Sequence, residues 1–114
     1  MASRDGTGLD RRNIMVGGTR TSLALESQLW GAIIDICRRE ELSIDDFCTL
    51  LQAADTGASL ASTLRVGVLL YLRTLTDPQP AIGMDAPGIE MDGLEVSPRL
   101  AYVIKQLAAS GDTN

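Results

Sequence analysis

The stretch "RTSLAL", which ends at Leu25, constrains the fold of this chain more than any other segment, because polar and apolar side chains alternate along it. Successive side chains of a β-strand point to opposite faces of the sheet. Leu23 and Leu25 are therefore expected to face a core, and Arg20, Ser22 and Ala24 to face outward. Directly after this stretch the pattern changes to the spacing of a helix.

This strand needs a partner, since a single strand is not stable alone. The preceding stretch "NIMV" is short and is cut off by Gly17 and Gly18, so it does not supply a convincing second strand. We therefore expect the strand to pair with its own copy in a second chain, as an antiparallel ribbon across a two-fold axis. The expected fold class is mainly α, with one N-terminal strand per chain in a homodimer.

Three helices are predicted after the strand. The first covers residues 27–41 and carries an apolar stripe. The second begins at Ser43, which forms the S-x-x-D pattern of a capping box with Asp46. The third covers residues 60–74 and is apolar almost all round, so we expect it at the centre. The dimer core expected from these patterns consists of Leu23, Leu25, Trp30, Ile33, Phe47, Leu64 and Val68.

The chain divides into five segments. Residues 1–11 lack periodicity and are expected to be a flexible arm. Residues 12–75 hold the expected dimerisation domain. Residues 76–96 contain all but one of the four prolines and several acidic residues, which indicates a linker. Residues 97–109 begin with Ser-Pro, a favourable helix start, and predict a short amphipathic helix. A disordered tail is expected at 110–114.

Charge and composition exclude several classes of protein. The formal net charge of −5 argues against non-specific coating of nucleic acid or of an anionic membrane. Cys37 and Cys48 fall in helical patterns and the chain contains no histidine, so no zinc site is expected. No apolar run is long enough to span a membrane, and the start lacks the apolar stretch of a signal peptide. We expect a bacterial cytoplasmic protein without metal or cofactor.

An enzyme is not expected either. Without histidine the chain has no Ser- or Cys-based triad, and it has no G-x-S-x-G elbow. The stretch "VGGTRTS" lacks the spacing of a phosphate-binding loop. The carboxylates of residues 85–95 do not follow the pattern of a calcium loop.

The strand together with the following "LESQLWGAIIDICRREELSIDDF" resembles the ribbon-helix-helix family of bacterial DNA-binding proteins, to which Arc and MetJ belong. The continuation "GASLASTLRVGVLLYLR" is similar to a subgroup of uncharacterised ribbon-helix-helix domain proteins. The resemblance covers about residues 12–74. It implies a homodimer whose two-stranded ribbon enters the major groove of double-stranded DNA, and a role as a transcriptional regulator that represses.

The resemblance also implies roles for particular residues. The outward side chains of the strand would read bases: Arg20 by two hydrogen bonds to guanine, Ser22 by a bond to either kind of base edge, and Ala24 through its methyl group. The family anchors phosphates on backbone N–H groups at the start of its second helix. Phosphate contacts are therefore expected from Ser43, Ile44 and Asp45, and from Arg11 and Arg12 in the arm.

Two features oppose DNA binding. Asp45 and Asp46 put negative charge where a phosphate would dock. Residues 11–74 contain seven arginines and seven acidic residues, so this part of the chain is neutral overall.

The alternative is a dimeric interaction module or adaptor that binds another protein through residues 80–109. The first part of this segment mixes acidic and apolar residues, as do segments that become ordered on a partner. The apolar stripe of the last helix would hold the partner, or would instead fold back on the dimer. This stripe consists of Leu100, Val103, Ile104 and Leu107.

Overall fold

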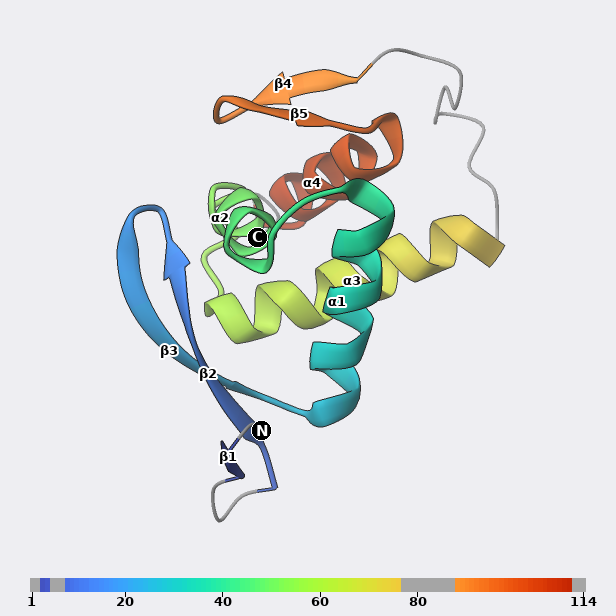
Figure 1. The fold of residues 1–114 in the computed structure, drawn as a ribbon. Coiled ribbons are helices and arrows are strands. Elements are labelled where there is room, and N and C mark those ends of the chain that lie inside the picture. Colours follow the sequence, from blue (N-terminus) through green and yellow to red (C-terminus); the bar gives the residue numbers. More distant parts are fainter. Residues whose placement is uncertain (1–2, 5–7, 77–87, 112–114) are drawn as a thin grey trace.

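The structure, a computed structural model, describes residues 3–4, 8–76 and 88–111. The β2–β3 hairpin runs along one side of a body of helices, and the small β4–β5 hairpin lies beside the start of α4 (Figure 1). This mainly α architecture, in which N-terminal strands precede three helices and a C-terminal helix, confirms the mainly α fold class. The elements are β1 (Ser3–Arg4), β2 (Asp10–Val16), β3 (Thr19–Leu25), α1 (Ser27–Glu40), α2 (Ile44–Gln52), α3 (Leu60–Thr76), β4 (Ile89–Met91), β5 (Leu94–Val96) and α4 (Pro98–Gly111).

The strand that pairs with β3 belongs to the same chain, which corrects the expectation that a second copy supplies it. β2 and β3 pair antiparallel over their whole length, from Asp10 opposite Leu25 up to the turn. Gly17 and Gly18 form this two-residue turn, with φ angles of 58° and 84°. Glycine adopts such left-handed angles without steric penalty, and turns of this type match the twist of a hairpin. The two glycines therefore join the strands.

The outer edge of β2 is covered by β1 and by α2. β1 pairs with β2 at the start of the strand. Farther along, the N–H of Met15 donates to Oδ1 of Asp45 (3.1 Å), and the N–H of Gly17 donates to Oγ1 of Thr49 (3.0 Å). These bonds satisfy backbone donors that an uncovered strand leaves unpaired. β2 is thereby fixed to α2, whereas β3 forms the other edge of the described sheet.

The helix ends follow from local sequence signals. α1 stops where Glu41 takes a left-handed conformation, with φ 58° and ψ 44°. Ser43 caps α2, because its Oγ accepts the N–H of Asp46 at 3.0 Å, which confirms the predicted N-cap. α3 contacts α1, α2 and α4, so it is the central helix, as predicted from its apolar sequence.

The C-terminal helix packs back on the body of its own chain. The stripe formed by Leu100, Val103, Ile104 and Leu107 is buried, and α4 contacts α3 and α2. Its N-cap is confirmed, since Oγ of Ser97 accepts the N–H of Leu100 at 3.1 Å. Part of the expected linker is folded, because β4 and β5 pair across a turn at Asp92 and Gly93. The expected linker residues 77–87 and tail residues 112–114 lie outside the described residues.

The core of a single chain already contains the residues expected at the dimer core. Leu25, Trp30, Ile33, Phe47, Leu64 and Val68 are buried, and Leu23 packs against them half-buried. Two residues expected in the arm, Asp10 and Arg11, lie in β2. The core is therefore closed within the protomer, and the contacts of a dimer need another surface.

Gly67 allows α3 to approach α2 and α4. A Cβ at this position would lie 2.6 Å from Cδ2 of Leu51 and 3.4 Å from Cδ1 of Leu107, both of which are buried. We expect Gly67→Val to lower the free energy of unfolding by about 1–3 kcal/mol through overpacking. Gly31 is the matched control, because it is helical and exposed with nothing within 4 Å of its added Cβ.

Denaturant titration of the two glycine variants provides the measurement. Gly31→Val should change the stability by less than about 0.5 kcal/mol. An equal effect of both substitutions would contradict the close approach of α3 to its neighbours.

Candidate nucleic-acid interface

The outward face of the hairpin carries side chains from both strands. Directly opposite residues of a hairpin share a face. β2 and β3 thus bring together three outward pairs: Arg11 with Ala24, Asn13 with Ser22, and Met15 with Arg20. All of these side chains are exposed except that of Ala24, which is half-buried. Arg20, Ser22 and Ala24 face outward as the alternation predicted.

Asn13 and Met15 are part of this face and were missed by the sequence analysis. Their stretch "NIMV" is short, and the two glycines that follow it indicate the end of a strand. A Gly-Gly pair between two alternating stretches is itself a signal for a hairpin turn. Interpreted as a hairpin turn, the Gly17–Gly18 pair predicts both strands and all six outward positions.

Arg11 and Ser22 interact across the two strands. Nη1 of Arg11 donates to Oγ of Ser22 at 3.3 Å. The two residues are diagonal neighbours in the ladder, because Arg11 lies opposite Ala24. The hydrogen bond holds the guanidinium over the outward face, so that positive charge and a hydroxyl lie together at its middle.

Arg12 lies on the inner face, away from the outward side chains. Its guanidinium carbon is 5.2 Å from the centre of the Trp30 ring, which is the geometry of a cation–π contact. Its Nε is buried and has no hydrogen-bond partner among the described residues. The structure therefore does not place Arg12 beside Arg11 as a second cation for phosphate.

The root of the hairpin is anchored on α1. Nε1 of Trp30 donates to the backbone carbonyl of Asp10 at 2.9 Å, and the hydroxyl of Ser27 donates to the Asp10 carboxylate. The tip is anchored on α2 through Asp45 and Thr49. Because both ends are attached to helices, the outward face is held on a rigid support.

The start of α2 lies next to the tip of the hairpin. A cavity of about 160 Å³ is lined by Asn13, Ile14, Met15, Arg20 and Asp45, so the two expected contact regions adjoin. Ser43 is exposed, and Ile44 and Asp45 are half-buried. The Asp45 carboxylate accepts a backbone hydrogen bond from β2, so this acidic side chain has a structural partner at the expected phosphate site.

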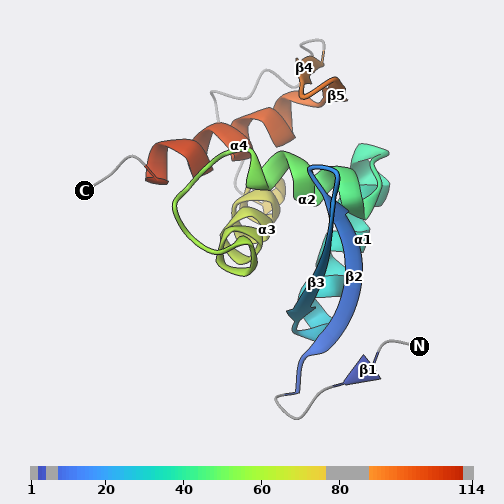
Figure 2. The same ribbon diagram turned by 90° about the vertical axis from the view of Figure 1, so that its left-hand side faces the viewer.

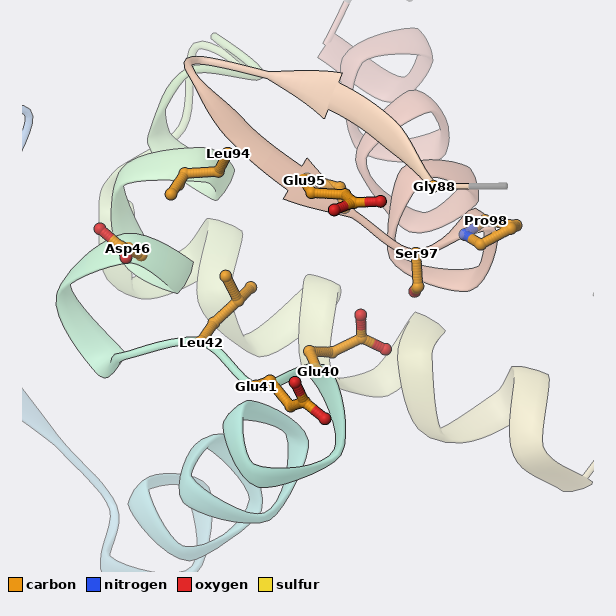
Figure 3. Close-up of a pocket in the computed structure, with 10 residues that line it drawn as sticks. Glu40, Glu41, Leu42, Asp46, Gly88, Leu94, Glu95, Ser97 and Pro98 are labelled. Carbon is orange, nitrogen blue, oxygen red and sulfur yellow. The ribbon is translucent and has the colours of Figure 1, made fainter. Parts of the chain in front are cut away.

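A larger, acidic pocket of about 520 Å³ lies between the end of α1, the start of α2 and the β4–β5 hairpin (Figure 3). Four carboxylates line it, those of Glu40, Glu41, Asp46 and Glu95. Oε2 of Glu40 accepts the hydroxyl proton of Tyr71 at 2.5 Å. Burial, followed by this bond, raises the pKa of Tyr71. The negative charge of the pocket repels phosphate, so the pocket itself is not suited to nucleic acid.

Among the residues that the structure describes, no three acidic or thiol side chains are grouped so as to hold a metal ion. None of the helices in the described ranges has the length and apolar character needed to cross a membrane.

Comparison with known proteins identifies the family of the chain. Residues 9–72, more than half of its 114 residues, match the family described as ribbon-helix-helix domain. No curated protein and no solved structure matched. Members of the family are typically DNA-binding transcription regulators, and they bind DNA as dimers. The matched region contains β2, β3, α1, α2 and most of α3, and the chain therefore belongs to the ribbon-helix-helix domain family.

Proposed function

We propose that this protein is a sequence-specific DNA-binding transcriptional repressor of the bacterial cytoplasm, active as a homodimer, that inserts the β2–β3 hairpin into the major groove. The observation that carries the proposal is the outward face of the hairpin. It presents Arg11, Asn13, Arg20 and Ser22 on a rigid two-stranded element, and the major groove of B-DNA is wide enough for a two-stranded β-ribbon.

The outward side chains suit particular base edges. Arg20 has the donors for two hydrogen bonds to guanine O6 and N7, and Asn13 matches N6 and N7 of adenine. Ser22 bonds to either kind of edge. Ala24 and Met15 offer apolar contact to the methyl group of thymine. The face thus combines direct base readers with apolar contacts.

Phosphates would be bound at two places beside the groove. Arg11 supplies a cation on the outward face, and the backbone N–H groups of Ser43, Ile44 and Asp45 lie at the positive end of the α2 dipole. The N–H of Asp46 is already used by the Ser43 cap. Because Arg12 lies over Trp30, the proposal assigns it no phosphate, and we expect a shallow dependence of affinity on salt.

The adaptor function has less support. It required the apolar stripe of the C-terminal helix to be available to another protein. Leu100, Val103 and Leu107 are instead buried against α3 and the rest of the core. Among the described residues, the apolar stripe of α4 is thus covered by the core of its own chain, so DNA binding remains the proposed function.

Selection of bound duplexes from a random pool, at near-physiological salt, tests the proposal. The wild type should enrich a short common sequence. Arg20→Ala should weaken binding to that sequence by about 1–3 kcal/mol and relax the preference at one base pair. Lys105→Ala is the charge-matched control, since Lys105 is exposed on α4, which packs on α3 and α2. No enrichment by a folded wild-type protein, or equal losses in both variants, would refute base reading by the hairpin.

A further inference from the structure

Two hydrogen bonds join the tip of the β2–β3 hairpin to helix α2. Figure 2 shows the turn of the hairpin beside this helix. The N–H of Met15 donates to Oδ1 of Asp45 at 3.1 Å, and the N–H of Gly17 donates to Oγ1 of Thr49 at 3.0 Å. Both acceptors belong to α2, so the strand that leads into the turn is held by one helix at two points.

The hairpin itself does not depend on these two bonds. β2 and β3 pair with each other along their whole length, while the N–H groups of Met15 and Gly17 are directed to α2 instead. A two-stranded hairpin on its own is only marginally stable. The bonds to α2 therefore determine where the tip lies relative to the helix.

Asp45 lies where the two proposed kinds of DNA contact meet. Its side chain lines the cavity of about 160 Å³ together with the outward residues Asn13, Met15 and Arg20. Met15, whose N–H the carboxylate accepts, is directly opposite Arg20 in the hairpin. The backbone N–H of Asp45 is at the start of α2, among those proposed to bind phosphate. One residue thus connects the base-reading strands to the phosphate-binding helix.

We infer that Asp45 is a positioning residue for sequence recognition: its carboxylate fixes the distance between the base-reading side chains of the hairpin and the start of α2. The inference rests on the proposed function. Phosphate contacts set the register of a protein on the duplex, and contacts to base edges read the sequence. Both kinds of contact must engage one duplex at the same time. A distance fixed before binding therefore favours the complex in which the bases are read.

This role gives a reason for a carboxylate at a surface that binds phosphate. The negative charge of Asp45 opposes phosphate at the start of α2 whatever the base sequence, because phosphates carry no sequence information. The hydrogen bond to Met15 matters only where the hairpin must hold one position over the bases. The charge thus affects binding to all DNA equally, and the hydrogen bond affects the preference for one sequence.

Titration with two duplexes separates these effects, one duplex carrying the sequence that the wild type selects and the other a random sequence. Asp45→Asn keeps an acceptor for the Met15 N–H but loses the charge. It should strengthen binding to both duplexes and keep the ratio of their dissociation constants within about 2-fold of the wild type. Asp45→Ala loses the acceptor as well, and the preference for the selected duplex should fall about 10-fold or more.

Two further variants control for charge and for folding. Asp46→Ala removes the same charge from the next residue, whose side chain lines the acidic pocket (Figure 3), and should keep the preference. Thr49→Val removes the acceptor of the Gly17 N–H without a change of charge, and should lower the preference. Far-UV circular dichroism establishes that each variant is folded. Thr49→Val tests the role of the anchors even if Asp45→Ala does not fold.

Amide hydrogen exchange in the free protein tests the anchor without DNA. The N–H of Met15 should exchange about 10-fold or more faster in Asp45→Ala than in the wild type or in Asp45→Asn. Equal exchange in all three would overturn the inference. So would an unchanged preference in folded Asp45→Ala, or in Thr49→Val, when the wild type selects a sequence. A folded wild type that selects no sequence would refute the proposed function, and the inference with it.

Discussion

Replacing Trp30 with alanine should lower the free energy of unfolding by about 3–5 kcal/mol, the range for removing a large buried aromatic side chain. Trp30 is 2% exposed and lies between α1 and the inner face of the hairpin. Its indole donates to the Asp10 carbonyl at 2.9 Å, and its ring supports the Arg12 guanidinium. One substitution therefore removes packing, a hydrogen bond and a cation–π contact together.

Urea unfolding of the alanine variant and of Trp30→Phe separates these contributions. Phenylalanine keeps an aromatic ring but cannot donate to the Asp10 carbonyl. Trp30→Phe should therefore lower the free energy of unfolding by less, about 1–3 kcal/mol for the missing donor. If alanine lowered the free energy of unfolding less than phenylalanine does, the hairpin would not be packed on α1 as described.

The two cysteines should be almost unreactive in the folded protein. Burial, together with a smaller effect of nearby negative charges, raises the pKa of Cys48 from its ordinary value of 9.0 to about 12 and that of Cys37 to about 11. The thiolate is the reactive form. At pH 8, raising the pKa by two to three units lowers the thiolate population by roughly 100- to 1,000-fold. Burial of both side chains slows the reaction further.

Labelling with a disulfide reagent at pH 8, with and without denaturant, gives the measurement. Both thiols should react at least about 100-fold more slowly in the folded protein. Cys37→Ala and Cys48→Ala, each with one remaining thiol, assign the two rates. Rapid labelling of either variant in buffer alone would contradict the packing of α1 against α2.

The same cysteines predict how stability depends on pH. Their pKa values are higher in the folded than in the unfolded chain, so the unfolded chain loses these protons first as the pH rises. The two protonated thiols contribute fully to the free energy of unfolding below pH 9. This contribution is lost as the pH rises from 9 to about 12.

The helices could be predicted from the sequence because their signals are local. Ser43 and Ser97 cap helices at the positions where a hydroxyl precedes an apolar stripe. The stripe of Leu100, Val103 and Leu107 likewise predicted a helix with one buried side. Whether that side packs on its own chain depends on tertiary contacts, which the stripe itself does not contain.

The hairpin was only half predicted. Its Gly17–Gly18 turn is a local signal, but Arg12 shortens the apolar alternation of β2 that would support it. In β2 the inward positions are Asp10, Arg12, Ile14 and Val16, so a charged residue interrupts the apolar alternation. That residue is tolerated because Trp30, eighteen positions later, accepts its guanidinium. The edge of β2 depends on Asp45 and Thr49, which are farther still. These partners of β2 are too far along the chain to be recognised from a short stretch of sequence.

In the candidate site, too, the features set by neighbouring residues could be predicted, and those set by distant residues could not. Alternation alone placed Arg20 and Ser22 on the outward face. It could not show that Asp45 would bond to β2, which ties the start of α2 to the hairpin tip. The roles of these residues at DNA stay predictions until the binding experiments are done.

The turn at Gly17 and Gly18 also affects how this protein can evolve. In a ribbon made from two chains, every outward position is encoded once but occurs twice, so one mutation alters two places at the groove. Here Asn13 and Ser22 are separate codons that face outward side by side. A single nucleotide change therefore alters one outward position of a hairpin and leaves the opposite position of the same hairpin intact, so the two positions can change independently.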